Sequence, residues 1–268
     1  MSAAEGGGMS VDPNRPSAAR IYDHFLGGTH NFAVDREVAE RAFALVPDLP
    51  QVARDNRAFL RRAVRFAASR GVRQFIDIGS GIPTQGNVHE AALAADPGAR
   101  VVYVDVDPTA VIHSRQILGD DPRTVVLQAD LHQADSILGD PSVRALVDFG
   151  QPVCLLLVAM LHFIPDSPDL HAALRRFRDA FAPGSLLAVS HGSAGPRTER
   201  LDELADLYVR TGTPLVLRDR EAILDLFDGW EVLDPGLVHL PLWRPDPGDP
   251  PVGDPGTYAA VAAVGVRP

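Results

Sequence analysis

The sequence contains no lysine, so all 25 of its basic residues are arginines. Reactions that need a lysine, such as Schiff-base formation with pyridoxal phosphate or phosphate binding by a P-loop lysine, are therefore excluded. The formal net charge of −10 disfavours a nucleic-acid-binding surface. We expect no nucleic acid among the partners of this protein.

Cysteine occurs once, at Cys154, which excludes an intramolecular disulfide and a zinc site built of cysteines. This residue lies in the apolar run 153–158, where a small thiol is expected to pack in the core. No apolar run is long enough to span a membrane, and the first residues lack the charged and apolar regions of a signal peptide. These absences predict a cytoplasmic protein with no membrane partner.

Residues 75–84 indicate a buried strand followed by a sharp turn at glycines, and the stretch 85–95 then has a helical pattern. Such a unit brings backbone N–H groups close to a ligand. A dinucleotide-binding fingerprint would place a third glycine at Thr84, and Pro83 lacks the N–H that a pyrophosphate would need. The turn is typical of a site for an adenosyl group without phosphates. Its candidate ligand-binding residues are Asp77, Gly79, Ser80 and Gly81.

Acidic residues follow the next two apolar runs, 100–105 and 124–128. At the end of the first, a carboxylate can accept hydrogen bonds from both hydroxyls of a ribose. After the second, a carboxylate can accept from the exocyclic amine of adenine, and the next backbone N–H can serve the ring. A single acid of this kind is usually a turn residue. Together with Asp77, however, three acids lie at successive strand ends, which indicates that this edge of the sheet binds a ligand. The candidates here are Asp105, Val106, Asp130 and Leu131.

Apolar runs alternate with helical patterns along the chain, which indicates βαβ units and a parallel sheet. Strands are expected near residues 74–79, 100–105, 124–128, 153–158, 185–190, 230–240 and 258–266. Helices are expected before them, at residues 17–26, 33–46 and 51–69. We therefore divide the chain into a disordered tail (1–14), a helical cap or lid (15–70) and a cofactor-binding core (71–268).

Four segments resemble the class I S-adenosylmethionine-dependent methyltransferases, and more narrowly a bacterial family now called the S-adenosyl methyltransferase family. They are residues 19–32, 56–60, 77–84 and 156–166. The resemblance covers about residues 15–268. It implies a Rossmann-like α/β fold with a seven-stranded, mostly parallel sheet, an antiparallel last strand and an N-terminal helical extension. It also implies S-adenosyl-L-methionine as the cofactor, whereas the family has no settled methyl acceptor.

The N-terminal extension adds further candidate cofactor contacts. Tyr22, Phe25 and Phe32 can cover an adenosyl group, and the glycines at 27–28 can be either the joint of a lid or the end of a helix. The arginines of the stretch 51–69 are expected mainly to face solvent. Arg57, which lies in one of the family segments, is the exception and is the candidate partner of the methionine carboxylate.

Chemistry is expected after the fourth and fifth strands, where open α/β sheets bind their ligands. The backbone of Val158, Ala159 and Met160 is predicted to face the sulfonium. His162 and His191 follow the two strands, and either can be a general base. A lone histidine in an apolar segment is more often structural, and alignment alone can drive methyl transfer to some acceptors.

Two functions are compatible with these residues. We favour an S-adenosylmethionine-dependent methyltransferase that acts on a small molecule without a metal ion, since no carboxylate ends the fourth strand. The alternative is a non-catalytic S-adenosylmethionine-binding protein with a regulatory or interaction role. Pro83 and Thr84 disfavour a third function, that of a nicotinamide-dependent oxidoreductase.

Overall fold

The computed structural model describes residues 12–83, 86–193, 199–210, 212–249 and 260–268. Residues 1–11 of the predicted tail 1–14 lie outside this part of the chain, as do Thr84 and Gln85. Within the described residues, no helix has the length and apolar character needed to cross a membrane.

A single mixed sheet forms the centre of the molecule. Its strands are β1 (Gln74–Ile78), β2 (Arg100–Asp105), β3 (Thr124–Gln128), β4 (Val153–Val158), β5 (Leu186–Gly192), β6 (Glu231–Val232), β7 (Val238–His239) and β8 (Ala260–Val266). The order is β3-β2-β1-β4-β5-β8-β6, and β7 also pairs with β8. The first five strands are parallel, whereas β8 is antiparallel to its neighbours. This arrangement confirms the predicted α/β fold with a mostly parallel sheet and an antiparallel last strand.

The sheet has eight strands where seven were expected, because the strand predicted at 230–240 is interrupted. Its two ends, β6 and β7, both pair antiparallel with β8. Between them lies Pro235, whose nitrogen carries no hydrogen to donate to a ladder. Two short strands thus take the place of one long strand at this edge.

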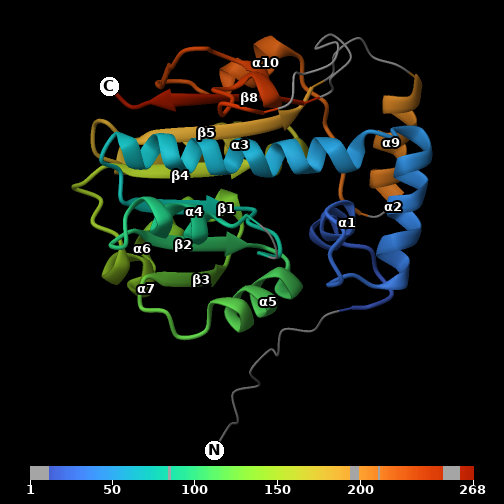
Figure 1. The fold of residues 1–268 in the computed structure, drawn as a ribbon, viewed down its shortest axis with the longest axis horizontal. Coiled ribbons are helices and arrows are strands. Elements are labelled where there is room, and N and C mark those ends of the chain that lie inside the picture. The colour runs from blue at the N-terminus through green and yellow to red at the C-terminus, as the bar shows by residue number, and fades with distance from the viewer. Residues whose placement is uncertain (1–11, 84–85, 194–198, 211, 250–259) are drawn as a thin grey trace, which may run out of the picture.

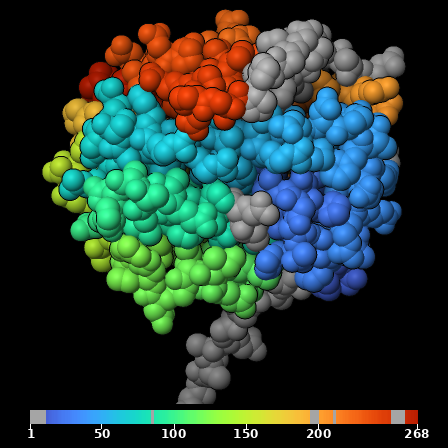
Figure 2. Space-filling view, viewed as in Figure 1, coloured from blue at the N-terminus to red at the C-terminus, as the bar shows by residue number. Residues whose placement is uncertain are grey.

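Helices cover both faces of the sheet (Figure 1). On one face lie α3 (Leu49–Ser69) and α4 (Val88–Ala95), and on the other lie α6 (Ala134–Gly139), α7 (Pro141–Leu146), α8 (Pro168–Ala180) and α10 (Arg220–Asp225). Figure 2 shows α3 as a band across its face of the molecule. Successive strand residues pack in opposite directions, Phe75 and Cys154 towards α3 and Ile76 and Leu155 towards α8. Cys154 is 1% exposed, which confirms it as a core residue.

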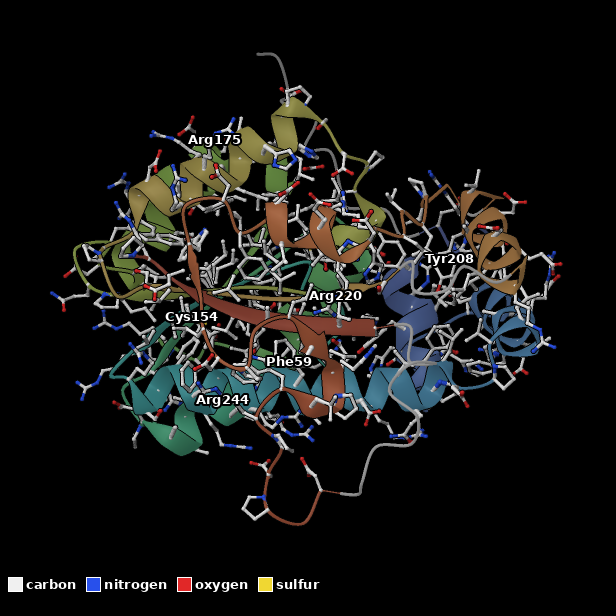
Figure 3. All side chains as sticks on the ribbon, turned by 90° about the horizontal axis from the view of Figure 1, so that it is seen from above. Phe59, Cys154, Arg175, Tyr208, Arg220 and Arg244 are labelled. Atoms are coloured by element: carbon white, nitrogen blue, oxygen red, sulfur yellow. The ribbon has the colours of Figure 1, made fainter. Side chains whose placement is uncertain are left out.

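Three more helices stand at the carboxyl ends of the parallel strands (Figure 1). They are α1 (Ala18–Phe25), α2 (Ala33–Leu45) and α9 (Glu199–Arg210). Ile21 of α1, Ala39 of α2 and Leu204 and Tyr208 of α9 belong to one buried apolar cluster. Figure 3 shows Tyr208 on this side of the molecule, beside the N-terminal helices. The cluster therefore joins the N-terminal extension to a late segment of the chain.

The N-terminal helices lie close to the predicted residues 17–26, 33–46 and 51–69. After α1, Gly27 has a φ of 77°, and the N–H groups of Gly27 and Gly28 donate to carbonyls of α1 at 2.9 and 2.8 Å. This pattern is a Schellman-type helix end. The structure thus shows the glycine pair as a helix end. The helix predicted at 85–95 begins later, at the first residue of α4.

The prediction that α3 carries mainly solvated arginines is wrong for Arg62, which is 5% exposed. Its guanidinium donates to the carbonyls of Trp243 at 2.9 Å and Leu240 at 2.7 Å. The Trp243 ring packs edge-on against Phe59 and Phe66 of α3. These contacts hold the segment after β7, which includes the short helix η3 (Leu240–Leu242), against α3.

Candidate functional site

A cavity of about 800 Å³ lies at the carboxyl ends of β1 to β5, beside α1 and α9. All the residues that the sequence proposed as cofactor-binding or catalytic line it, whereas the proposed cover residue Phe32 does not. Those that line it are Tyr22, Arg57, Asp77, Gly79, Ser80, Gly81, Asp105, Val106, Asp130, Leu131, Val158, Ala159, Met160, His162 and His191. The fold therefore brings together residues from the N-terminal helices and from all five parallel strands.

The glycine turn after β1 has the backbone conformation that glycine permits. Gly79 and Gly81 have φ angles of 71° and 63°, which are costly for other residues. A Cβ at Gly79 would lie 2.6 Å from the side chain of Met160, whereas a Cβ at Gly81 would meet nothing within 4 Å. The backbone at Gly81 is thus open to close approach by a ligand.

Two buried carboxyls lie beside this turn. Asp105 accepts hydrogen bonds from the N–H groups of Gly81 at 2.7 Å and Asp107 at 2.8 Å. Burial raises the pKa of Asp105 to about 6 and that of Asp77 to about 7, although Arg57 opposes the shift at Asp77. Each carboxylate oxygen has a second lone pair. The carboxyls of Asp77 and Asp105 can therefore accept hydrogen bonds from a ligand or lie beside its positive charge.

Asp130 serves as a cap residue as well as a cavity residue. It precedes the short helix η1 (Leu131–Gln133) and accepts from the N–H of His132 at 2.8 Å. Its side chain is 48% exposed, so one face of the carboxylate is open. Leu131 itself is buried.

Arg57 of α3 carries an unsatisfied donor. Its Nε is buried and has no hydrogen-bond partner among the described residues, and its guanidinium carbon lies 5.4 Å from the centre of the Tyr22 ring. A buried guanidinium N–H without a partner is uncommon and fits a site that receives an anionic group. With the two carboxyls and the open glycine turn, these donors and acceptors fit S-adenosylmethionine.

A chain of hydrogen bonds that the sequence did not predict crosses the site. Asn56 donates to the Tyr22 hydroxyl at 2.9 Å and accepts from the Ser190 hydroxyl at 2.5 Å. Ser190 in turn accepts from the N–H of Ala159 at 2.9 Å. Ala159 has a φ of 56°, which is strained for alanine. The only sequence signal was the position of Asn56 in a family segment.

The two candidate histidines belong to another network that was not foreseen. His191 lies between the buried Arg218, whose Nη1 is 2.7 Å from its Nε2, and the carbonyl of Gly192, 2.5 Å from its Nδ1. His162, in the short helix η2 (Leu161–Phe163), accepts from the N–H of Gly192 at 3.2 Å through its Nδ1. Both ring nitrogens of His191 are therefore occupied.

The N-terminal extension is anchored at the start of α5 (Pro108–Leu118), beside the cavity. Arg20 and Asp35 form a buried ion pair at 2.7 Å, and Asp35 also accepts from the N–H of Ser17 at 2.9 Å. The Ser17 hydroxyl donates to Asp107, which caps α5. Phe32 lies under the Arg20 guanidinium and is not among the described lining residues, contrary to its predicted role as a cover.

The described residues contain no group of three or more His, Cys, Asp or Glu side chains placed to hold a metal ion.

Comparison with known proteins gave matches over nearly the whole chain. A family model described as S-adenosyl methyltransferase matches residues 4–268. A crystal structure from Thermobifida fusca, assigned as a methyltransferase, is 39% identical with a TM-score of 0.88 and covers 99% of both chains. A DUF574 family protein from Streptomyces avermitilis is 35% identical with a TM-score of 0.91, over 96% of this chain and 99% of that one.

A more distant structure shows likeness of fold alone. The N-methyltransferase NodS from Bradyrhizobium japonicum, in complex with S-adenosyl-L-homocysteine, is 14% identical with a TM-score of 0.52, over 93% of this chain and 99% of that one. No curated protein sequence matches this chain.

The strain at Ala159 is testable. Replacing Ala159 by glycine removes a left-handed penalty of about 1–2 kcal/mol but adds backbone entropy worth about 0.5–1 kcal/mol. We expect Ala159→Gly to raise the free energy of unfolding in urea by roughly 0.5–1 kcal/mol. Ala129, which also lines the cavity but does not have a positive φ, is the control, and Ala129→Gly should lower it. Equal destabilisation by both changes would contradict the strain.

Proposed function

Because this chain belongs to the S-adenosyl methyltransferase family and is an S-adenosylmethionine-dependent methyltransferase, we propose that its methyl acceptor is a small molecule and that transfer needs no metal ion. The convergence of the predicted cofactor-binding and catalytic residues on one cavity of about 800 Å³ carries this proposal. Pockets of this size suit small ligands. Family membership also favours the enzyme over the non-catalytic binding protein considered above.

We assign the cofactor contacts as follows. Asp105 accepts from the two ribose hydroxyls, Asp130 accepts from the adenine amine, and the backbone of Leu131 serves the adenine ring. Arg57 binds the methionine carboxylate through the N–H that lacks a partner. When bound, S-adenosylmethionine supplies an electrophilic methyl group on a positively charged sulfur.

The residues after β4 support transfer without a metal. Val158 is followed by Ala159 and Met160, which offer backbone and apolar groups to the reacting atoms, whereas protein sites for hard cations usually include carboxylate oxygens. Ser190 fixes the N–H of Ala159, and Met160 packs close to Gly79. We infer that these residues act by aligning the acceptor with the methyl group.

We also propose that residues 15–70 act as the cap and residues 71–268 as the core. Tyr22 and Phe25 of α1 and Arg57 of α3 all line the cavity, which supports a cap that excludes water from the reacting atoms. A cytoplasmic location remains part of the proposal.

The acceptor class can be tested with methyl-labelled S-adenosylmethionine. In a whole-cell extract of Streptomyces avermitilis, the source of a similar protein, the full-length protein should transfer label to compounds that pass a small-molecule filter afterwards, and should release S-adenosylhomocysteine. Transfer should be unchanged in EDTA. Label found only in protein or nucleic acid, or loss of transfer in EDTA, would contradict the proposal.

The assignment of the ribose to Asp105 predicts a loss of affinity. Asp105→Ala removes charge-assisted hydrogen bonds worth roughly 1.5–3 kcal/mol each, so the affinity for S-adenosylhomocysteine should fall about tenfold or more. Calorimetry measures the change. Asp121→Ala is the matched control, since Asp121 pairs with Arg123 outside the cavity and its loss should leave affinity unchanged. Equal affinities of the two variants would place the ribose elsewhere.

The raised pKa values predict pH-dependent binding. The ammonium group of S-adenosylhomocysteine and its ribose hydroxyls favour the ionised carboxylates. The ligand should therefore lower the pKa of Asp77 from about 7 and that of Asp105 from about 6. Binding then releases protons. Affinity for S-adenosylhomocysteine should rise with pH and level off above about pH 7, falling below it by up to about tenfold per unit for each proton released.

Calorimetry near pH 6.5, in buffers of different ionisation enthalpy, counts the protons exchanged. Proton uptake on binding, or an affinity that does not change with pH, would show that these carboxyls do not face the cofactor.

A further inference from the structure

The cavity has a second half whose chemistry differs from that of the strand ends. It is lined by apolar and aromatic side chains from α1, η2, α9 and the loop that follows α9. They are Phe25, Phe163, Leu204, Tyr208, Leu215 and Leu217. The described lining residues between positions 201 and 217 include no charged side chain. Burial raises the pKa of the Tyr208 hydroxyl, which therefore stays neutral.

Two arginines lie near this half of the cavity, and neither offers a free buried charge. Arg218 is buried but pairs with Asp166 at 2.8 Å. The other is Arg15. It is exposed and lies beside Gly212, where a Cβ would come within 2.8 Å of its guanidinium. An anionic molecule held in the apolar half would have no buried counter-charge from the 201–217 wall. Burying an unpaired charge costs far more than burying an apolar group. The wall therefore favours an uncharged molecule.

His162 of η2 also lines the cavity, and the position of its imidazole proton is set by groups that can only donate. Arg218 is 3% exposed, and its guanidinium can only donate, so His191 must accept at Nε2 and carry its proton on Nδ1. That proton is donated to the carbonyl of Gly192. The N–H of Gly192 can also only donate, so His162 accepts at Nδ1. His162 must then carry its proton on Nε2.

Burial and the charge of Arg218 oppose protonation of both histidines. Burial lowers the pKa of His162 well below its usual value, and the neighbouring His191 and Arg218 lower it further. Burial likewise lowers the pKa of His191 to about 4. His162 Nε2 has no hydrogen-bond partner among the described residues, and it is not one of their fully buried atoms that lack a partner. Because His162 lines the cavity, this N–H is available as a donor to a molecule bound there.

We propose that this apolar half binds an uncharged, largely apolar methyl acceptor with a hydrogen-bond-accepting oxygen, and that His162 positions the acceptor by donating its Nε2–H to that oxygen. The inference rests on the proposed function, because it names the acceptor class of the same site. His162 is a positioning residue here and takes no proton. An acceptor without such an oxygen would leave the donor unpaired, which costs affinity.

Matched probes test the acceptor class. Acetophenone, ethylbenzene and benzoate have similar size and differ in carrying a neutral carbonyl, no polar group or a negative charge. They are titrated by NMR into the full-length protein saturated with S-adenosylhomocysteine. Acetophenone should bind tightest and benzoate weakest. Tighter binding of benzoate, or no binding of acetophenone, would overturn the inference.

Variants test the donor. His162→Phe should weaken acetophenone binding about threefold to tenfold and leave ethylbenzene binding unchanged, and His162→Gln should restore part of the loss because its amide can also donate. Phe163→Leu, a change in the neighbouring apolar wall, should weaken both probes alike. Equal effects of His162→Phe on the two probes would show that His162 acts through packing.

A spectroscopic measurement on the unaltered protein is independent of whether variants fold. Imidazole ¹⁵N shifts should show His162 as the Nε2–H tautomer, without titration around neutral pH, and its proton should shift when acetophenone is added. An Nδ1–H tautomer or a titrating imidazole would overturn the inference. Failure of the protein to bind S-adenosylhomocysteine would instead contradict the proposed function, so the two failures are distinguishable.

Discussion

The hydrogen-bonded chain from Tyr22 through Asn56 and Ser190 to Ala159 is the constraint on which the cavity depends. It joins α1, α3, β5 and the end of β4, so the helices that cover the cavity and the strands that form its floor share one set of contacts. Asn56 is 4% and Ser190 1% exposed. Removing either would leave a buried polar partner unsatisfied, at a cost of about 1–3 kcal/mol. The strained backbone of Ala159 is held in place by the same contacts.

A second buried polar group sets how far the cap can move. Asp35 accepts from Arg20, from the N–H of Ser17 and from the N–H of Phe32, while the Ser17 hydroxyl donates to Asp107, the cap residue of α5. Breaking a buried ion pair by removing one partner costs about 3–5 kcal/mol. A lid motion of α1 alone would have to break these contacts. Any movement of α1 that keeps these contacts must therefore carry α2 with it.

Sequence reasoning succeeded where a local pattern has one physical cause. The runs 100–105, 124–128 and 153–158 became β2, β3 and β4 with the same bounds, because short apolar runs rich in β-branched residues and bounded by turn residues favour strands. Of these three, only β4 is buried along its whole length, whereas the edge strand β3 is partly buried. The site residues converged because parallel strands end at one edge. Arg62 and Asn56 were missed because their partners lie 181 and 134 residues away, and no local pattern separates a buried polar residue on a helix from a solvated one.

The histidines show the same limit for chemistry. His162 and His191 are equivalent in sequence terms, each following a strand, yet their partners give them different roles. Arg218 and Gly192 occupy both nitrogens of His191 and leave His162 one donor. The residue type determines which ring nitrogens can carry a proton, and the hydrogen-bond partners determine which of them does. A site that holds an acceptor without removing its proton relies on alignment, which suits nucleophiles that already carry a free lone pair at neutral pH.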